Sequence, residues 1–564
     1  MLGQAGGTKE GGGSAGSKHS VRCPRLLKPA AHPILTPHRE SPRARSLLSR
    51  ALRHAAAAGC QLAASVLRRS LFASFFARRW KACLVLQSAI KSIDASTTRA
   101  EAGEEKKHGS TLGNLARTGD AYKRVRAGKR MEAVAKGGRQ GAVRVRAAAT
   151  AERAGSTAVE RNPHLGKLQA GYLFPTIARK KQERQQENPD ADLIALGIGD
   201  ATEPIPPVIA DALAKAGQGL ATPEGFSGYG PEQGQMRLRE ALASRMYNSL
   251  VEPSEVFVSD GSKCDIARMQ ILFGSNRTIA VQDPAYPAYV DTSVMAGHST
   301  GWDDRSQGYA GIQYMKCTPS NGFFPDLDEA KNAEIIFFCS PNNPTGYAAT
   351  EQQLKQLVDF CKEQGSILVF DAAYTFYIED DDCPTSIYEI EGAREVAIET
   401  QSLSKYAGFT GVRLGWTVVP HELTYADGTP VNQDWNRIMG TCFNGASNIV
   451  QEGAMACLSD EGMDAMRDMV AYYKENANLL TQCFKELGFE VHGGRNCPYI
   501  WVLYNGRASW TVFEELLRNT DIVTTPGSGF GEGGEGAVRV SAFQNRERVE
   551  EAIRRLKAYY SNSN

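Results

Sequence analysis

The amino-acid sequence predicts an α/β fold, with a mostly parallel central sheet, helices on both of its faces, and a smaller α+β domain. Between about residues 256 and 400, short apolar runs alternate with amphipathic helical stretches, which is the order that parallel strands joined by crossover helices require. Polar and small residues cluster directly after several of these runs. After Trp416 the alternation loosens into one long helix and mixed short elements, which indicates a second, α+β domain.

The expected strands are short apolar runs that end at Gly, Pro, Asn, Asp or Ser. Their length and their bounding residues favour buried strands over helices. In chain order they are Leu193–Leu196, Val256–Val258, Thr278–Gln282, Ile335–Phe338, Ile367–Phe370, Val396–Ile398, Tyr499–Tyr504 and Ala537–Phe543.

The expected helices carry apolar residues three and four positions apart. Thr350 and Gln353 have the capping-box spacing that starts a helix, and Gly488 stops the long one. The helices are a short polar one after Phe174, Met236–Ser249, a run through Ile266 and Leu272, one that starts at Thr350 and runs through Cys361, Met463–Leu487, Thr511–Leu517, and a final one through Val549 and Leu556.

With 564 residues, the chain is longer than one ordinary domain. We predict an N-terminal extension over residues 1–155, a segment 156–205 that contributes to the small domain, a large domain 206–450 and a small C-terminal domain 451–564. The extension is rich in Arg, and its first hundred residues contain only three acids, which is typical of organelle transit peptides. Val143–Ala147 is a plausible processing region. A disordered basic tail or a mistaken upstream start remain alternatives.

Charge and composition exclude several classes of function. The formal net charge is +1, so nothing points to nucleic acid or acidic lipid as a partner. The most apolar stretch, Leu71–Leu86, is interrupted by Arg78, Arg79 and Lys81 and cannot span a membrane. The 12 cysteines contain no C-x-x-C pair, which favours a reducing compartment, and no Cys/His cluster indicates a metal. The acidic run Glu379–Asp382 is interpreted as a solvated loop.

The segment Ser402–Trp416 carries the clearest chemical signal. Lys405 lies between small hydroxyl residues, and Arg413 follows eight positions later. Lysine amines condense with aldehydes, whereas hydroxyls and a guanidinium suit a phosphate. Pyridoxal 5'-phosphate (PLP) offers both groups, so the segment suggests a PLP site. A surface lysine in a Ser/Gly loop is the alternative for this stretch alone.

Other residues at strand ends complete such a site, because ligands of open α/β sheets bind at the carboxyl ends of the strands. Asp371 can face the pyridine nitrogen of PLP, and Asn343 and Tyr374 can hydrogen-bond its 3'-oxygen. Tyr286 can stack on the ring, and Ser262 begins a helix that can bind phosphate. Each has a structural alternative, as a cap, a turn or a filler. Gly529–Gly534 fits G-x-G-x-x-G, but a strand follows it, so a dinucleotide site is not expected.

Three motifs resemble the PLP-dependent class I/II aminotransferases of fold type I. They are Ser340–Gly346, Asp371–Tyr374 and Ser402–Lys405 followed by Arg413. Five further segments resemble the plant and algal members that act on LL-2,6-diaminoheptanedioate: Phe226–Gly234, Asp260–Asp265, Gln282–Asp291, Phe443–Asn448 and Thr524–Gly531. The resemblance covers about residues 161–560.

The resemblance implies a role for each matching position. Lys405 is implied to attach the cofactor and to carry the proton during catalysis. The implied cofactor contacts are Ser262, Lys263, Tyr229 of the partner subunit, Tyr286, Asn343, Asp371, Tyr374, Ser402, Ser404, Lys405 and Arg413. The implied substrate contacts are Tyr172, Gly199, Glu232 of the partner subunit, Lys263, Tyr286, Asn343, Asn444 and Arg539. Asn448 remains the alternative to Asn444, and Ser262 stands where many relatives have alanine.

The resemblance also implies a reaction and an assembly. The amino group of glutamate would pass to tetrahydrodipicolinate, giving LL-2,6-diaminoheptanedioate for lysine biosynthesis by a ping-pong mechanism. The enzyme would be a homodimer with active sites shared between subunits, in the plastid stroma rather than the mitochondrion. Two alternatives remain: another aminotransferase or carbon–sulfur lyase on the same scaffold, and a binding or regulatory protein without turnover.

Overall fold

A computed structural model describes residues 157–169 and 173–561, which lie in one compact unit spanning 149–564. The predicted extension 1–155 and Tyr172 lie outside the described residues. The predicted boundaries between the large and small domains therefore stay a prediction, and the elements are described below one sheet at a time.

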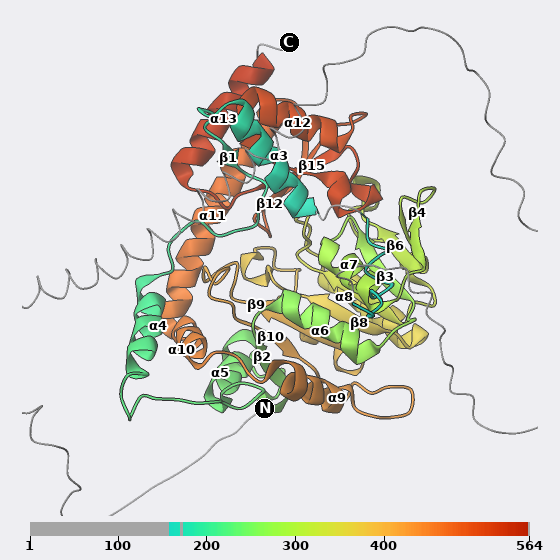
Figure 1. Ribbon diagram of the computed structural model, residues 1–564, viewed down its shortest axis with the longest axis vertical. Helices are drawn as coiled ribbons and strands as arrows, with labels where there is room; N and C mark the ends of the chain where they lie inside the picture. Colours follow the sequence, from blue (N-terminus) through green and yellow to red (C-terminus); the bar gives the residue numbers. More distant parts are fainter. Residues whose placement is uncertain (1–156, 170–172, 562–564) are drawn as a thin grey trace, which may run out of the picture. The chain divides into compact units, whose positions relative to one another are not determined.

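A seven-stranded sheet forms the centre of this unit (Figure 1). All neighbouring strands are parallel except β10, which runs antiparallel to both of its neighbours. Most of their residues are buried, which explains why the strands read as continuous apolar runs. The order is β2 (Val256–Ser259), β10 (Gly415–Val418), β9 (Ala397–Ser402), β8 (Ile367–Asp371), β7 (Ile335–Cys339), β3 (Ile279–Asp283) and β6 (Ile312–Lys316).

Helices connect these strands and cover the sheet, and α6 packs on β2, β9 and β10. The predicted capping box at the start of α8 is present: Thr350 accepts from the Gln353 N–H, and Gln353 accepts from the Thr350 N–H. Gly365, at φ 71°, ends that helix in a left-handed conformation. The helices are α4 (Pro207–Gly219), α5 (Met236–Tyr247), α6 (Ser262–Phe273), α7 (Pro287–Ala296), α8 (Glu351–Gln364), α9 (Val431–Ile438) and α10 (Asn448–Cys457).

A second, four-stranded antiparallel sheet follows in the chain. Its order is β11 (Glu490–Gly493), β12 (Tyr499–Leu503), β15 (Ala537–Ser541) and β14 (Thr525–Pro526). The helices packed nearby are α3 (Leu173–Glu187), α12 (Ser509–Thr520) and α13 (Arg546–Ser561). The described residues also form two short two-stranded sheets: β1 (Ile194–Ala195) with β13 (Ile522–Val523), and β4 (Gly301–Asp303) with β5 (Gly308–Ala310).

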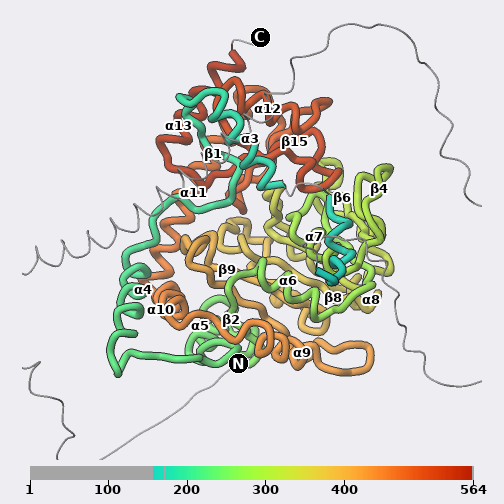
Figure 2. The backbone as a smooth tube through the Cα atoms, in the orientation of Figure 1, coloured from blue at the N-terminus to red at the C-terminus, as the bar shows by residue number. Residues whose placement is uncertain are grey.

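The 27-residue helix α11 (Asp460–Glu486) joins the two parts (Figure 2). The Ser459 hydroxyl caps its start by accepting from the Gly462 N–H. Met466 and Val470 belong to the apolar core around the central sheet, whereas Ala477 and Leu480 belong to the core of the second sheet. One helix therefore contributes to both cores.

Candidate active site

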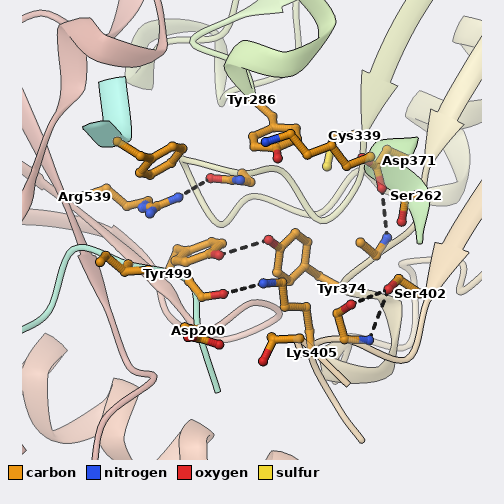
Figure 3. A pocket seen from close by; sticks show the side chains of 18 of the residues that line it. Asp200, Ser262, Tyr286, Cys339, Asp371, Tyr374, Ser402, Lys405, Tyr499 and Arg539 are labelled. Atoms are coloured by element: carbon orange, nitrogen blue, oxygen red, sulfur yellow. Dashed lines mark hydrogen bonds between the residues drawn. The ribbon is translucent and has the colours of Figure 1, made fainter. Parts of the chain in front are cut away.

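A cavity of about 380 Å³ lies at the carboxyl ends of the central strands (Figure 3). Three residues that line the cavity are the last residues of central strands: Asp371 ends β8, Ser402 ends β9, and Cys339 ends β7. The predicted site residues that line the cavity are Gly199, Ser262, Lys263, Tyr286, Asn343, Asp371, Tyr374, Ser402, Ser404, Lys405, Arg413 and Arg539.

Lys405 lies in the turn that follows β9, with its amine inside the cavity. Its Nζ donates a hydrogen bond to the carbonyl oxygen of Gly199. Burial lowers the pKa of Lys405 to about 8, although the carboxylate of Asp200 opposes this shift, and the cations Arg539 and Arg413 add to it. A substantial fraction of the amine is therefore neutral near physiological pH, as a nucleophile requires.

Asp371 is buried directly beside the cavity. Burial raises the pKa of its carboxyl group to about 6, against the hydrogen bonds that it accepts from Tyr289 Oη at 2.7 Å and from the Ala373 N–H at 3.2 Å. An anionic carboxylate at this depth is stabilised by a cation placed against it. The protonated nitrogen of a pyridine ring is such a cation.

One end of the cavity gathers anion-binding groups. Ser262 is the first residue of α6, where unpaired N–H groups and the helix dipole favour a phosphate. Ser402 Oγ and Ser404 Oγ are 2.7 Å apart, and Arg413 lines the same cavity. Gly261 has φ 119°, a conformation that favours glycine, and a Cβ atom there would lie 2.6 Å from an Arg413 guanidinium nitrogen.

Another part of the cavity holds Arg539, whose side chain is 1% exposed. Its Nη1 donates to Asn343 Oδ1 at 2.5 Å, and its Nη2 donates to the Gly197 carbonyl oxygen at 2.6 Å. Its Nε has no hydrogen-bond partner among the described residues. A buried guanidinium held by neutral groups is suited to a carboxylate ligand, which supplies the missing charge and acceptors.

Tyr286 and Lys263 lie on a further side of the cavity. The Tyr286 ring meets Tyr289 edge to face, with centroids 5.6 Å apart, and Lys263 Nζ lies 5.7 Å from the Tyr286 ring centroid. Tyr374 Oη lies 2.9 Å from Tyr499 Oη. These contacts fix the directions of side chains that the sequence could only assign to the site.

Of the predicted site residues that the structure describes, three do not line the cavity of this chain. Tyr229 is 93% exposed, and Glu232 and Asn444 are exposed as well. A Cβ atom on Gly445 would lie 3.6 Å from Glu232 Cα, so the Glu232 and Asn444 segments are neighbours. Asn448 donates to Ser227 Oγ and to the Gly228 carbonyl oxygen, so its amide holds the segment that carries Tyr229.

Several lining residues were not predicted from the sequence as site residues: Phe174, Ile198, Asp200, Tyr289, Cys339, Ala373, Thr410 and Tyr499. Asp200 ends the segment Gly197–Asp200, which directly follows the predicted strand Leu193–Leu196. Tyr289 repeats the Pro-Ala-Tyr unit of Tyr286, which was a usable signal. Tyr499 sits in an apolar strand and carried no such signal.

This donor set fits PLP. One cavity contains a partly neutral lysine for the aldehyde and a buried carboxylate for the ring nitrogen. It also contains a helix N-terminus with hydroxyls and a guanidinium for the phosphate, and a buried arginine for a substrate carboxylate.

Among the described residues, no group of His, Cys, Asp and Glu side chains could hold a metal ion. Within that same part of the chain, no helix is long and apolar enough to cross a membrane.

Comparisons with known proteins agree with this geometry. Residues 191–556 match the family aminotransferase class I and II. The chain is 59% identical over 405 residues to a protein of Arabidopsis thaliana named LL-diaminopimelate aminotransferase, chloroplastic, covering 72% of this chain and 88% of the relative. A relative of the same enzyme name from Protochlamydia amoebophila is 53% identical over 399 residues, 71% of this chain and 97% of the relative.

Among solved structures, the L,L-diaminopimelate aminotransferase of Chlamydomonas reinhardtii matches with a TM-score of 0.70 and 61% identity, over 72% of this chain and 100% of the other. These identities far exceed what a shared fold alone produces, and the family match spans most of the described residues. The chain belongs to the class I and II aminotransferase family.

Proposed function

We propose that this enzyme moves an amino group between glutamate and tetrahydrodipicolinate, forming 2-oxoglutarate and LL-2,6-diaminoheptanedioate, with PLP as cofactor. The cavity that joins Lys405, Asp371 and Arg539 carries the proposal, because it combines an amine, a site for a ring cation and a site for a carboxylate. The names of the Arabidopsis and Protochlamydia relatives support the choice of substrate. The reaction belongs to lysine biosynthesis.

PLP, when bound, supplies an electron-withdrawing ring that acidifies the α-hydrogen of an attached amino acid. Lys405 would hold the cofactor until substrate arrives and then move the proton from the substrate's α-carbon. Its lowered pKa suits both roles, because each requires the neutral amine. Asp371 would hold the ring nitrogen in its protonated form, supported by its hydrogen bond from Tyr289.

The other residues that line the cavity would bind and orient the cofactor and the substrates. Ser262, Ser402, Ser404 and Arg413 would hold the phosphate, and Asn343 and Tyr374 the 3'-oxygen of the ring. Arg539 would bind the α-carboxylate, which both amino acids share. This separation of tasks lets glutamate and LL-2,6-diaminoheptanedioate use one site in turn, as a ping-pong reaction requires.

Substrate choice would depend on the distal ends of these molecules. LL-2,6-diaminoheptanedioate carries a second ammonium and carboxylate, whereas glutamate carries a carboxylate alone. Lys263 would serve the distal carboxylate, and Glu232 of the partner subunit the distal ammonium. Tyr172, Gly199, Tyr286 and Asn444 are assigned to the remaining substrate surface.

We propose a homodimer in which each site takes Tyr229 and Glu232 from the other subunit. The support is that both side chains are exposed and lie away from the cavity of their own chain. The same segment exposes Phe226 and Met236, which an isolated subunit would leave in water. Small-molecule amino and oxo acids are the only other partners proposed.

We also propose a plastid location. The Arabidopsis relative has a name that ends in "chloroplastic", and the arginine-rich extension is typical of an organelle transit peptide. A fusion of residues 1–155 to a fluorescent protein tests this: plastid import is expected, and mitochondrial import would overturn it.

Amino-donor and acceptor profiling of the enzyme with added PLP tests the function. We expect transfer from LL-2,6-diaminoheptanedioate to 2-oxoglutarate with a kcat/KM well above that for alanine or aromatic amino acids. Broad activity with those amino acids would favour another aminotransferase, and release of a thiol from cystathionine would favour a carbon–sulfur lyase. Absence of turnover with all of them would overturn the enzymatic assignment.

A further inference from the structure

Tyr499, the first residue of β12, lies between two parts of the active site (Figure 3). Its hydroxyl is 2.9 Å from the hydroxyl of Tyr374, and its ring centroid is 4.2 Å from Arg539 Cζ. The side chain is buried, so neither contact is weakened by water. One residue therefore touches both the assigned 3'-oxygen ligand and the assigned carboxylate ligand.

The contact with Arg539 is part of an aromatic enclosure. The guanidinium carbon also lies 4.8 Å from the ring centroid of Phe530 and 5.9 Å from that of Phe174. Aromatic faces attract a desolvated guanidinium and restrict its orientation. β-sheet pairing places Tyr499 opposite Ser541, two residues beyond Arg539 on β15, so the sheet fixes the relation of the two side chains.

The hydroxyl of Tyr499 is fixed by its other neighbours. A Cβ atom on Gly199 would lie 2.1 Å from Tyr499 Oη, so the backbone at Gly199 closes tightly over this hydroxyl. The carbonyl oxygen of the same Gly199 accepts the hydrogen bond from Lys405 Nζ. The Tyr499 hydroxyl is thus directed at Tyr374 by a segment that also orients the lysine.

We propose that Tyr499 is a positioning residue with two separable actions. Its hydroxyl donates to Tyr374, which strengthens the hydrogen bond that Tyr374 gives to the 3'-oxygen of the cofactor. Its ring holds Arg539 in the orientation that binds the substrate's α-carboxylate. The proposal rests on the proposed function for the roles of Tyr374 and Arg539, and it adds a residue that was not predicted from the sequence.

The two actions predict different defects in different variants. Tyr499→Phe keeps the ring and removes the hydroxyl. The charged form of the cofactor's 3'-oxygen loses stabilisation, so the pH midpoint of the bound-cofactor absorbance is expected to rise by about half a unit or more. The KM for amino donor and oxo acceptor should stay within about twofold of wild type, because the ring still contacts Arg539.

Tyr499→Leu and Tyr499→Met remove the ring with side chains of different shape. Both variants are expected to raise KM for amino donor and oxo acceptor by about tenfold, because Arg539 loses its aromatic support. They should also show the spectral shift of Tyr499→Phe, since they lack the hydroxyl. A merely structural role of Tyr499 would not separate the spectral midpoint from KM in this way.

Tyr504→Phe is the matched control. Tyr504 directly follows β12, is buried, and pairs its hydroxyl with that of Tyr560 at 3.0 Å, but it does not line the cavity. The variant loses a hydroxyl pair of the same kind, and its spectral midpoint and KM are expected to match wild type.

The experiment titrates the absorbance of each purified holoenzyme and measures kcat and KM with whichever amino donor the wild type uses. An unchanged midpoint in Tyr499→Phe, or a tenfold rise of its KM, would overturn the proposed separation. Unchanged KM in both non-aromatic variants would overturn the action on Arg539. If the wild type rejects LL-2,6-diaminoheptanedioate, the proposed function fails, while the titration still decides the role of Tyr499.

Discussion

At the scale of single residues, Lys405 is the most sensitive position. We expect Lys405→Ala to reduce kcat by about a thousandfold or more, because both the covalent link to PLP and the proton carrier are lost. The visible absorbance of the lysine-linked cofactor should disappear. Lys355→Ala, on α8, is the control because Lys355 lies at the surface, where it pairs with Asp359. Retained turnover in the Lys405 variant would refute the assignment.

The lowered pKa of Lys405 predicts how cofactor attachment depends on pH. The neutral amine attacks the aldehyde, so its attachment rate should rise about tenfold per pH unit below pH 8 and level off above it, because burial lowers the lysine pKa to about 8 from 10.5. Stopped-flow absorbance of the apoenzyme mixed with PLP measures this rate, with a free amine as reference.

Asp200 provides an internal check on that profile. Its carboxylate raises the pKa of Lys405, so Asp200→Asn should move the plateau to lower pH. Asp304→Asn, in an exposed loop outside the cavity, should leave the profile unchanged. A profile that still rises up to pH 10 in the wild type would contradict the role of burial.

The sequence predicted the residues whose chemistry can be inferred from their local motif, such as Lys405 after Ser402 and Ser404, and Asp371 at the end of an apolar run. It did not predict Tyr289 or Tyr499 as site residues. Their hydrogen-bond partners are 82 and 125 positions away in the chain, so only the folded sheets bring them together. The repeated Pro-Ala-Tyr unit could have marked Tyr289 as a site residue, but no local pattern identifies the distant partner of either tyrosine.

At the scale of elements, the start of α6 depends on its close approach to β10. A Cβ atom on Gly415 would lie 2.6 Å from the Gln401 carbonyl oxygen and 2.8 Å from Gly261 Cα. We expect Gly415→Ala to displace Ser262 and weaken PLP binding by about tenfold, the effect of losing one charge-assisted hydrogen bond. Gly411→Ala is the matched control, because its added Cβ meets nothing within 4 Å. Equilibrium dialysis of PLP against the apoenzymes compares them.

The sequence predicted those helices and strands that are long enough to show a period and that begin or end at a recognisable residue. Helix α8 was predicted because Thr350 and Gln353 form a capping box in front of a periodic apolar face. Strand β10 was not predicted, because it begins at a glycine and its four residues are too few to establish a period. Its antiparallel position is set by pairing with β2 and β9 on both sides, which is a tertiary effect.

At the scale of the whole molecule, the proposed shared site predicts complementation between defective subunits. Lys405→Ala and Glu232→Gln homodimers should both be impaired. Co-expressed subunits form mixed dimers with one intact site, so random pairing should restore about one quarter of wild-type activity. Steady-state assays of co-purified, differently tagged subunits measure this.

Failure of complementation in isolated mixed dimers would contradict the contribution of Glu232 across subunits. The control is a mixed dimer of Lys405→Ala with Asp371→Asn. Both of these positions belong to the cavity of one chain, so every mixed dimer has two defective sites and should remain inactive.

The helix α11 has a consequence for how the enzyme melts. Because Met466 and Ala477 belong to different cores on one continuous helix, neither core can lose its packing without exposing part of the other. Heat should therefore melt both regions in one cooperative calorimetric transition, although two separate sheets would suggest two. The cofactor cavity, bordered by residues of both sheets, would then have no partly melted state in which half of it persists.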